Sequence, residues 1–109
     1  MKKLIINFSK LLLIITIFTF NFNQAKSDEI FKKGKIIFLE QGNCAACHML
    51  ADAGSDGNIG PNLNQIRPDI NRVIMAVTNG IGIMPAYQGE LTPEEIEAVG
   101  HYVSISSEN

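Results

Sequence analysis

The apolar and polar positions divide this chain into an apolar leader and three amphipathic segments. The leader contains the apolar run Leu11–Phe20, in which only two threonines are polar. Beyond it, apolar residues return every three or four positions over about Glu29–Gln41, Asp69–Thr78 and Pro93–Ser104. This period is typical of helices that bury one face. Glycine, proline and asparagine interrupt the period elsewhere, so the pattern predicts an all-α chain of three main helices joined by loops.

The first and last helices are predicted to cross. The apolar stripe of the first helix consists of Ile30, Phe31, Gly34, Ile37 and Phe38, and Gly42 follows its end. A glycine inside a helix costs up to about 1 kcal/mol relative to alanine, and on an apolar stripe it usually marks the close approach of another helix. Tyr102, on the stripe of the last helix, is the side chain expected to meet Gly34.

The later helices have clear boundary signals. Asp69 is placed to cap the second helix, and Gly80 follows its end with a residue that accepts positive φ. Thr92, Pro93 and Glu95 form a capping box with proline at the first helical position. These signals predict helices that begin next to Asp69 and Thr92.

Three features are predicted to lie outside the regular structure or the core. The stretch Met49–Pro61 has no periodicity and many glycine, aspartate and asparagine residues, so we expect a loop. His101 lies off the stripe of the last helix and is expected to be a solvated surface residue. Residues Ser106–Asn109 are predicted to form a tail.

The leader has the organisation of a secretory signal peptide. Lys2, Lys3 and Lys10 precede the apolar run, and small residues at Ala25 and Ser27 suit cleavage after Ser27. We therefore predict a signal peptide over residues 1–27 and one domain over residues 28–109. Asparagines 21 and 23 interrupt the apolar run, which argues against a full membrane span of about 20 residues. An uncleaved anchor over Leu4–Phe22 is the alternative.

Removing the leader changes the charge of the chain. Four of the nine basic residues lie in the leader and all eleven acidic residues lie after it, so residues 28–109 carry a formal net charge of −6. This balance disfavours binding to nucleic acid or to an anionic membrane surface. A domain of this size has a marginal apolar core, and a bound apolar group in its middle would strengthen it.

The segment Cys44–His48 reads C-x-x-C-H, the attachment signature of c-type haem. Two thiols three residues apart on a tight turn can each add across a vinyl group of the haem, and His48 then presents its imidazole to the iron. The alternatives are a disulfide or redox pair and a zinc site. A zinc site needs four ligands, and His101 is the only further cysteine or histidine. The sequence therefore favours haem c.

Other residues complete the predicted haem site. An iron-bound imidazole normally donates its second ring N–H to a carbonyl or carboxylate, and the carbonyl of Pro61 is a candidate partner. Leu63 and Ile66 are expected to pack on the macrocycle. Met84, on a glycine-rich loop and followed by proline, is the candidate sixth ligand. Ordinary core packing is the alternative role for Met84.

The other methionines are less suitable as a sixth ligand. Met49 adjoins His48 and is too close to it to reach the other face of the haem. Met75 lies within a regular helix, and Met1 leaves with the leader.

Taken together, these motifs resemble those of the class I c-type cytochromes, in particular small single-haem proteins such as cytochrome c6 and the bacterial cytochromes c551 and c552. The residues that carry the resemblance are Gly34, Phe38, Cys44–His48, Gly60–Leu63, Asn79–Pro85, Leu91–Ile96 and Tyr102. It implies three to four helices wrapped around one haem, thioether bonds from Cys44 and Cys47, and His48 and Met84 as axial ligands. The segment Gly60–Tyr87 is also similar to cytochrome subunits of periplasmic dehydrogenases, such as sulfite-oxidising enzymes.

Two functions from different classes are compatible with these residues. The first is a one-electron carrier that cycles between Fe(II) and Fe(III), exchanges electrons with redox protein partners and makes or breaks no substrate bonds. The second is a haem sensor or small peroxidase with a displaceable distal ligand. The sequence favours the carrier, because Met84 fills the distal position and no second histidine is well placed there. The leader and the resemblance imply export to a bacterial periplasm, or to the thylakoid lumen if the protein is photosynthetic.

Overall fold

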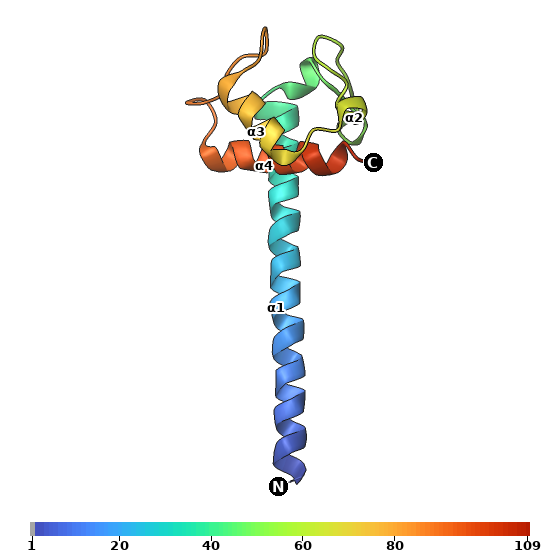
Figure 1. The fold of residues 1–109 in the computed structure, drawn as a ribbon, viewed down its shortest axis with the longest axis vertical. Helices are drawn as coiled ribbons and strands as arrows, with labels where there is room; N and C mark the ends of the chain where they lie inside the picture. The colour runs from blue at the N-terminus through green and yellow to red at the C-terminus, as the bar shows by residue number, and fades with distance from the viewer. Residues whose placement is uncertain (1) are drawn as a thin grey trace.

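The computed structural model describes the backbone of residues 2–109 and the side chains of residues 7–109. A long helix forms a stalk, and the remaining elements gather in a head at its end (Figure 1). The helices are α1 (Lys2–Ile36), α2 (Leu63–Ile66), α3 (Ile70–Asn79) and α4 (Pro93–Ser106), with a π-helical turn η1 (Ile37–Gln41) and single 3-10 turns η2 (Cys44–Ala46) and η3 (Ala51–Ala53). Two short strands, β1 (Met49–Leu50) and β2 (Ser55–Asp56), lie between η2 and α2. The prediction of an all-α fold is confirmed.

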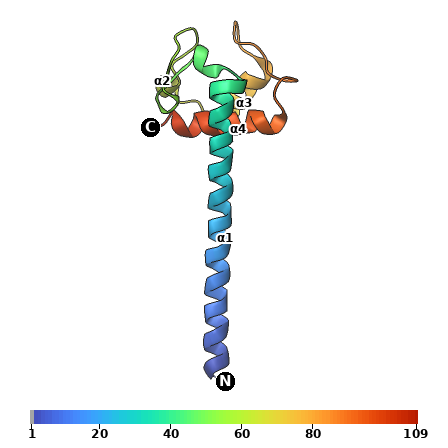
Figure 2. The ribbon, with the colours of Figure 1, turned by 180° about the vertical axis from the view of Figure 1, so that it is seen from behind.

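The predicted start of the first helix at Glu29 is wrong. Helix α1 begins at Lys2 and passes through the predicted cleavage point after Ser27 without a break. The reason is local, since residues 2–33 contain no proline or glycine, the residues least compatible with a helix interior, and include the good helix formers leucine and lysine. All side chains from Asn7 to Glu29 are exposed, and Figures 1 and 2 show no other element beside the blue, lower part of the stalk.

Within the described part of the chain, no helix is both long enough and apolar enough to cross a membrane. The alternative of a retained anchor over Leu4–Phe22 begins among residues whose side chains lie outside the described set. It therefore stays a hypothesis.

The predicted crossing of the terminal helices is confirmed. Helix α4 lies across the upper part of α1 in both views (Figures 1 and 2). A Cβ atom added to Gly34 would overlap the carbonyl oxygen of Ala98 and lie 2.6 Å from the Cβ of Tyr102. The Tyr102 side chain is fully buried, and its ring meets those of Phe31 and Phe38 edge-on at centroid distances of 5.1 and 5.7 Å. The absent side chain of Gly34 is what lets the two helices approach this closely.

The boundary predictions for the later helices are confirmed. Asp69 caps α3 by accepting a hydrogen bond from the backbone N–H of Arg72 at 2.9 Å. In α4, the Thr92 hydroxyl accepts from the N–H of Glu95, and the Glu95 carboxylate accepts from the N–H of Thr92. These side chains satisfy N–H groups that a helix start leaves without a partner.

The predicted tail is wrong at its start. Helix α4 continues to Ser106, and Ser106 and Ser107 are both 1% exposed. The amide of Asn64 donates to the carbonyl oxygens of Ser107 and Asn109 at 3.4 and 3.2 Å, so the end of the chain is held against α2. His101 lies off the buried face, as predicted, but is partly buried because it shares a shallow hollow with the Asn23–Phe31 stretch of α1.

The stretch predicted as an irregular loop contains a small hairpin. Strands β1 and β2 pair antiparallel, with Met49 opposite Asp56 and Leu50 opposite Ser55. The Ser55 hydroxyl accepts from the N–H of Leu50 and donates to the carbonyl of His48, each at 3.0 Å or less. Helix α2 is a single turn that the sequence pattern did not predict. Both elements are too short to show a period.

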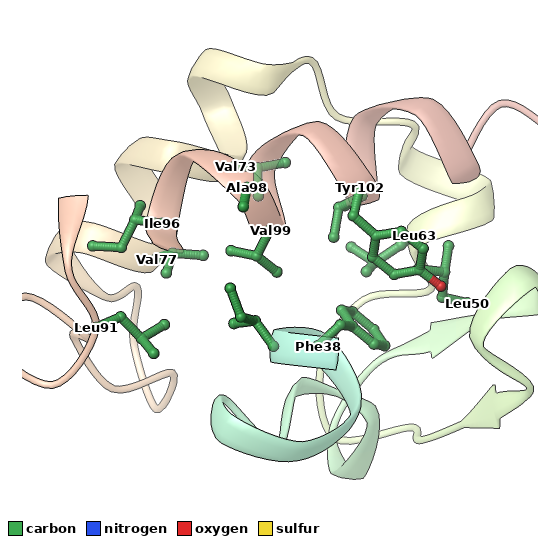
Figure 3. Packing of buried hydrophobic residues seen from close by; sticks show 12 residues of the cluster. Phe38, Leu50, Leu63, Val73, Val77, Leu91, Ile96, Ala98, Val99 and Tyr102 are labelled. Carbon is green, nitrogen blue, oxygen red and sulfur yellow. The ribbon is translucent and has the colours of Figure 1, made fainter. Parts of the chain in front are cut away.

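One apolar core holds the head together (Figure 3). Its buried members are Ile37, Phe38, Leu50, Leu63, Val73, Val77, Leu91, Ile96, Ala98, Val99, Tyr102 and Val103. Ile66, in contrast, is 40% exposed. These residues come from the turn η1 that follows α1, from α3 and α4, and from the segments around His48. The core therefore holds the segments that flank the candidate site against the terminal helices.

Candidate haem site

The two cysteines lie on a single tight turn. Asn43, with φ of 49° in the left-handed region, turns the chain out of η1 and into the 3-10 turn η2. The N–H groups of Cys47 and His48 both donate to the carbonyl of Cys44, at 3.1 and 3.0 Å. Residues i and i+3 of a 3-10 turn lie on the same side, so the two thiols share one face. Both cysteines are free and partly buried, and burial raises the pKa of the Cys44 thiol to about 11.

The imidazole of His48 is oriented by Pro61. The Nδ1 atom of His48 lies 2.8 Å from the carbonyl oxygen of Pro61. A carbonyl can only accept, so Nδ1 carries the proton in this hydrogen bond and Nε2 keeps its lone pair. Such a partner for Nδ1 is what a metal-binding imidazole normally has.

Gly60 packs against this imidazole and Gly57 packs against the backbone of the turn that carries it, roles that the sequence pattern did not predict for them. A Cβ atom on Gly60 would lie 2.5 Å from Cε1, 2.8 Å from Nδ1 and 3.0 Å from Nε2 of His48. A Cβ on Gly57 would lie 2.6 Å from the carbonyl carbon of Cys47. The N–H of Gly60 also donates to the carbonyl of Cys47 at 2.8 Å. The loop therefore lies flat against the ring, at a distance that only glycine allows.

The loop that carries Met84 is held by backbone hydrogen bonds. The N–H of Met84 donates to the carbonyl of Ile81 at 2.9 Å, and the N–H of Ile81 donates back at 3.2 Å. Gly80 has φ of 72°, and a Cβ there would lie 2.6 Å from the carbonyl oxygen of Met84. Met84 is partly buried and packs against the same core as Cys44.

The other methionines with described side chains are placed differently. Met75 lies within helix α3, as the sequence pattern predicted, and its side chain is 65% exposed. The sulfur of Met49 accepts a hydrogen bond from the Asn62 amide at 2.9 Å. Of these three thioethers, that of Met84 is the one on a loop beside the core.

Tyr87 joins the two sides of the site, and the sequence pattern did not single it out. Its phenol donates to the carbonyl of Gly42 at 2.7 Å, and its backbone N–H donates to the carbonyl of Val77 at 2.8 Å. Burial raises the pKa of Tyr87 above its ordinary value, so the phenol stays protonated at neutral pH. An aromatic residue three positions after a candidate methionine ligand is the only local signal of this role.

The donor set suits a covalently attached haem. Two unpaired thiols on one turn, an imidazole with a free Nε2 and a thioether on a separate loop are the groups that a c-type haem requires. Cys44 and Cys47 are both free and are not joined in a disulfide. Among the described side chains, no three histidine, cysteine, aspartate or glutamate residues gather in a way that could hold a metal ion such as zinc.

Comparison with known proteins agrees with this donor set. Residues 29–103 match the family described as cytochrome C oxidase, cbb3-type, subunit III. The chain is 36% identical over 111 residues to cytochrome c6 of Nostoc sp., covering 94% of this chain and 92% of that protein. It is 31% identical over 112 residues to cytochrome c6 of Gloeothece citriformis, covering 99% of this chain and 97% of that protein.

A solved structure is similar in both sequence and fold. The c-type cytochrome SorU from Sinorhizobium meliloti is 52% identical and superposes with a TM-score of 0.70. The match covers 73% of this chain and 93% of SorU. The expectation of a class I c-type cytochrome fold is thereby confirmed.

Proposed function

Since this chain belongs to the class I c-type cytochromes, we propose that the segment Cys44–His48 attaches its haem. As a member of this family, the chain is a monohaem electron carrier with one covalently bound haem c. His48 is then the first axial ligand of the iron and Met84 the second. Redox proteins are its partners. When bound, the haem supplies an iron ion that cycles between Fe(III) and Fe(II).

The cysteines act as the covalent tether. The thiols of Cys44 and Cys47 would hold the haem by adding across its vinyl C=C bonds, with each sulfur bonding one carbon and each thiol hydrogen going to the other. Each addition is redox-neutral and needs no oxidant. Both thiols are free, and they lie at the start and just after the end of the 3-10 turn η2.

The observation that carries the proposal is the hydrogen bond between His48 and Pro61. It leaves Nε2 as the nitrogen available to iron and raises the electron donation of the imidazole. The thioether of Met84 is a soft ligand that favours Fe(II) and so raises the reduction potential. With His48 and Met84 as its ligands, the iron would exchange electrons with redox proteins.

We further propose that the protein works after export, with residues 1–27 removed and the domain 28–109 acting as a monomer. The support is the basic and apolar leader, whose large apolar side chains are 51–73% exposed from Phe8 to Phe22. An exposed helix that is apolar on all sides is unsuited to water. The periplasm, or the thylakoid lumen in a photosynthetic organism, is the expected location, and the acidic domain is not expected to bind nucleic acid.

A second candidate role is that of a cytochrome subunit or acceptor for a periplasmic dehydrogenase, such as a sulfite-oxidising enzyme. The support is the segment Gly60–Tyr87, which resembles such subunits, together with the 52% identity to the c-type cytochrome SorU over 73% of this chain. Adding sulfite to a periplasmic extract that contains the oxidised protein tests this role. Rapid reduction of the haem would support it, and no reduction would leave the general carrier role.

Replacing Met84 tests the ligand assignment. We expect the purified ferric protein to show the weak far-red charge-transfer band of methionine ligation. Met84→Ala should lose this band, and its reduction potential should fall steeply because the Fe(II)-favouring thioether is gone. Met75→Ala is the matched control, since Met75 is exposed on α3 and is not a proposed ligand. This variant should keep the far-red band and the wild-type reduction potential.

Two results would contradict the proposal. A Met84→Ala protein with an unchanged band and potential would show that another residue is the ligand. A wild-type protein without the band, which binds carbon monoxide readily when reduced, would favour the sensor or peroxidase.

A further inference from the structure

The methionine loop has few attachments of its own. Between the end of α3 at Asn79 and the start of α4 at Pro93, the chain forms no helix or strand. Ile81 and Ile83, on either side of its tip, are 66% and 83% exposed. The paired hydrogen bonds between Ile81 and Met84 shape this tip but do not fix it to the rest of the molecule. Contacts made by loop residues outside Ile81–Met84 must therefore help to hold Met84 in place.

Tyr87 supplies attachments in two directions. Its backbone N–H binds the carbonyl of Val77 in α3, and its phenol binds the carbonyl of Gly42, 45 residues earlier in the chain. Its ring packs against the apolar core. Gly42 is itself fixed, because its N–H donates to the carbonyl of Ile37 at 2.8 Å and a Cβ atom added to it would lie 3.0 Å from the sulfur of Cys44.

We propose that Tyr87 is a positioning residue for the distal ligand, whose phenol hydrogen bond to Gly42 ties the Met84 loop to the cysteine side of the haem site. This inference rests on the proposed role of Met84. The hydrogen-bonded residues are close in sequence to the residues that they would position. Tyr87 lies three residues after Met84, and Gly42 lies two residues before Cys44. A covalently attached haem would fix the cysteine side, so the phenol limits how far the loop can move away.

The size of the effect follows from the hydrogen bond. One such bond contributes a net of about 1 kcal/mol, and its loss leaves the carbonyl of Gly42 without this donor. The open form of the loop would then be about fivefold more populated, because 1 kcal/mol corresponds to that factor near room temperature. Open forms expose the iron to added ligands and expose the Met84 N–H to solvent.

The test compares the two tyrosines of the chain, which offer a matched pair. Tyr102 also donates a 2.7 Å hydrogen bond across the molecule, to the carboxylate of Asp52, but it lies in the helix crossing. The holoprotein and its Tyr87→Phe and Tyr102→Phe variants would be titrated with imidazole in the ferric state, with the far-red band as the signal. Hydrogen exchange of the Met84 amide would be measured on the same samples.

We expect Tyr87→Phe to bind imidazole about fivefold more tightly than the wild type and to exchange the Met84 amide faster by a similar factor. Tyr102→Phe should lower the free energy of global unfolding but leave both readings within twofold of the wild type. Equal readings for Tyr87→Phe and the wild type would overturn the inference, and so would equal increases in both variants.

The design separates this inference from the proposed function. If the wild type has no far-red band, the assignment of Met84 is wrong, and the amide exchange still reports whether Tyr87 holds the loop. If the band is present but neither imidazole affinity nor exchange responds to Tyr87→Phe, the ligand assignment stands and the positioning role fails.

Discussion

The helix crossing and the haem site differ in what holds them together. At the crossing of α1 and α4, buried side chains do the work, since Phe38, Val99 and Tyr102 are each 1% exposed or less. At the candidate haem site, the proposed haem-binding residues Cys44, His48 and Met84 are only partly buried, and loop backbone hydrogen bonds position them. Apolar burial stabilises the fold, whereas the site has its geometry without large burial of its own.

The two regions use glycine for different purposes. Gly34 removes a side chain so that the backbones of two helices can approach, and Gly60 removes one so that a loop can lie against the His48 ring. The same substitution in the two places should therefore produce different effects. At the crossing it should change stability, and at the site it should change the environment of the iron.

The largest effect is expected at Gly34. In Gly34→Ala the new methyl group would overlap the carbonyl of Ala98 and the Cβ of Tyr102, so the helices must separate. Overpacking against a rigid backbone should lower the free energy of unfolding by about 3 kcal/mol. Denaturant titration of the holoprotein measures this loss.

Gly100→Ala is the matched control for Gly34→Ala. A Cβ at Gly100 meets only the flexible side chains of Ile74 and Ile70, at 3.0 and 3.4 Å. The change in stability should be within about 1 kcal/mol, because alanine is the better helix former. If the two variants were equally stable, close approach at Gly34 would not be what determines the crossing.

An intermediate effect is expected at Gly60. In Gly60→Ala the methyl group would press on the His48 ring and weaken the hydrogen bond to Pro61. The unfolding free energy should fall by about 2 kcal/mol. The reduction potential should also rise, since the imidazole then donates less electron density to the iron. Voltammetry and the NMR signals of His48 measure the second change.

Gly54→Ala is the control on the same loop. Gly54 has φ of 63°, and a Cβ atom added to it would have no heavy atom of another residue within 4 Å beyond its chain neighbours. Alanine there should therefore cost only about 1 kcal/mol of backbone strain. Its potential should not move. A rise in potential of equal size in both variants would mean that loop strain, rather than contact with the ring, is responsible.

The smallest effect concerns Asp52, which connects the crossing to the loop after His48. Hydrogen bonds from Tyr102 and then from Lys35 lower the pKa of the Asp52 carboxyl. The Tyr102 bond is 2.7 Å long, and Lys35 lies 3.1 Å away. A lowered folded-state pKa contributes stability above the ordinary pKa of about 4, and this stability is lost as the pH falls through the folded value.

Asp52→Asn should therefore be less stable than the wild type by about 1 kcal/mol at pH 7, a modest value because the carboxylate is about one-third exposed. The difference should shrink as the pH falls below about 4 and through the lowered folded-state pKa, below which the wild-type carboxyl is protonated as well. Unfolding titrations at the two pH values measure it. A difference that is independent of pH would mean that the charge of Asp52 does not contribute.

Local signals in the sequence were sufficient to predict where several helices begin. The capping residues Asp69 and Thr92 predicted the starts of α3 and α4, because a cap satisfies N–H groups of its own helix. Sequence composition alone did not reveal the true start of α1, since a processing signal does not break a helix. The β1–β2 hairpin and α2 were missed because each is too short to show a period.

Short-range spacing in the sequence was enough to predict the chemistry of this protein: the haem-attachment motif at Cys44–His48, the thioether of Met84 on a glycine-rich loop, and helices with one apolar face. These depend on residues close together in the chain, where spacing alone fixes relative position. The tertiary structure was needed to show how the candidate haem ligands and the end of the chain are held. Tyr87 contacts Gly42, Gly60 contacts His48, and Asn64 contacts Ser107. These partners lie between 12 and 45 residues apart, and their pairing follows from the packing of the core rather than from any local pattern.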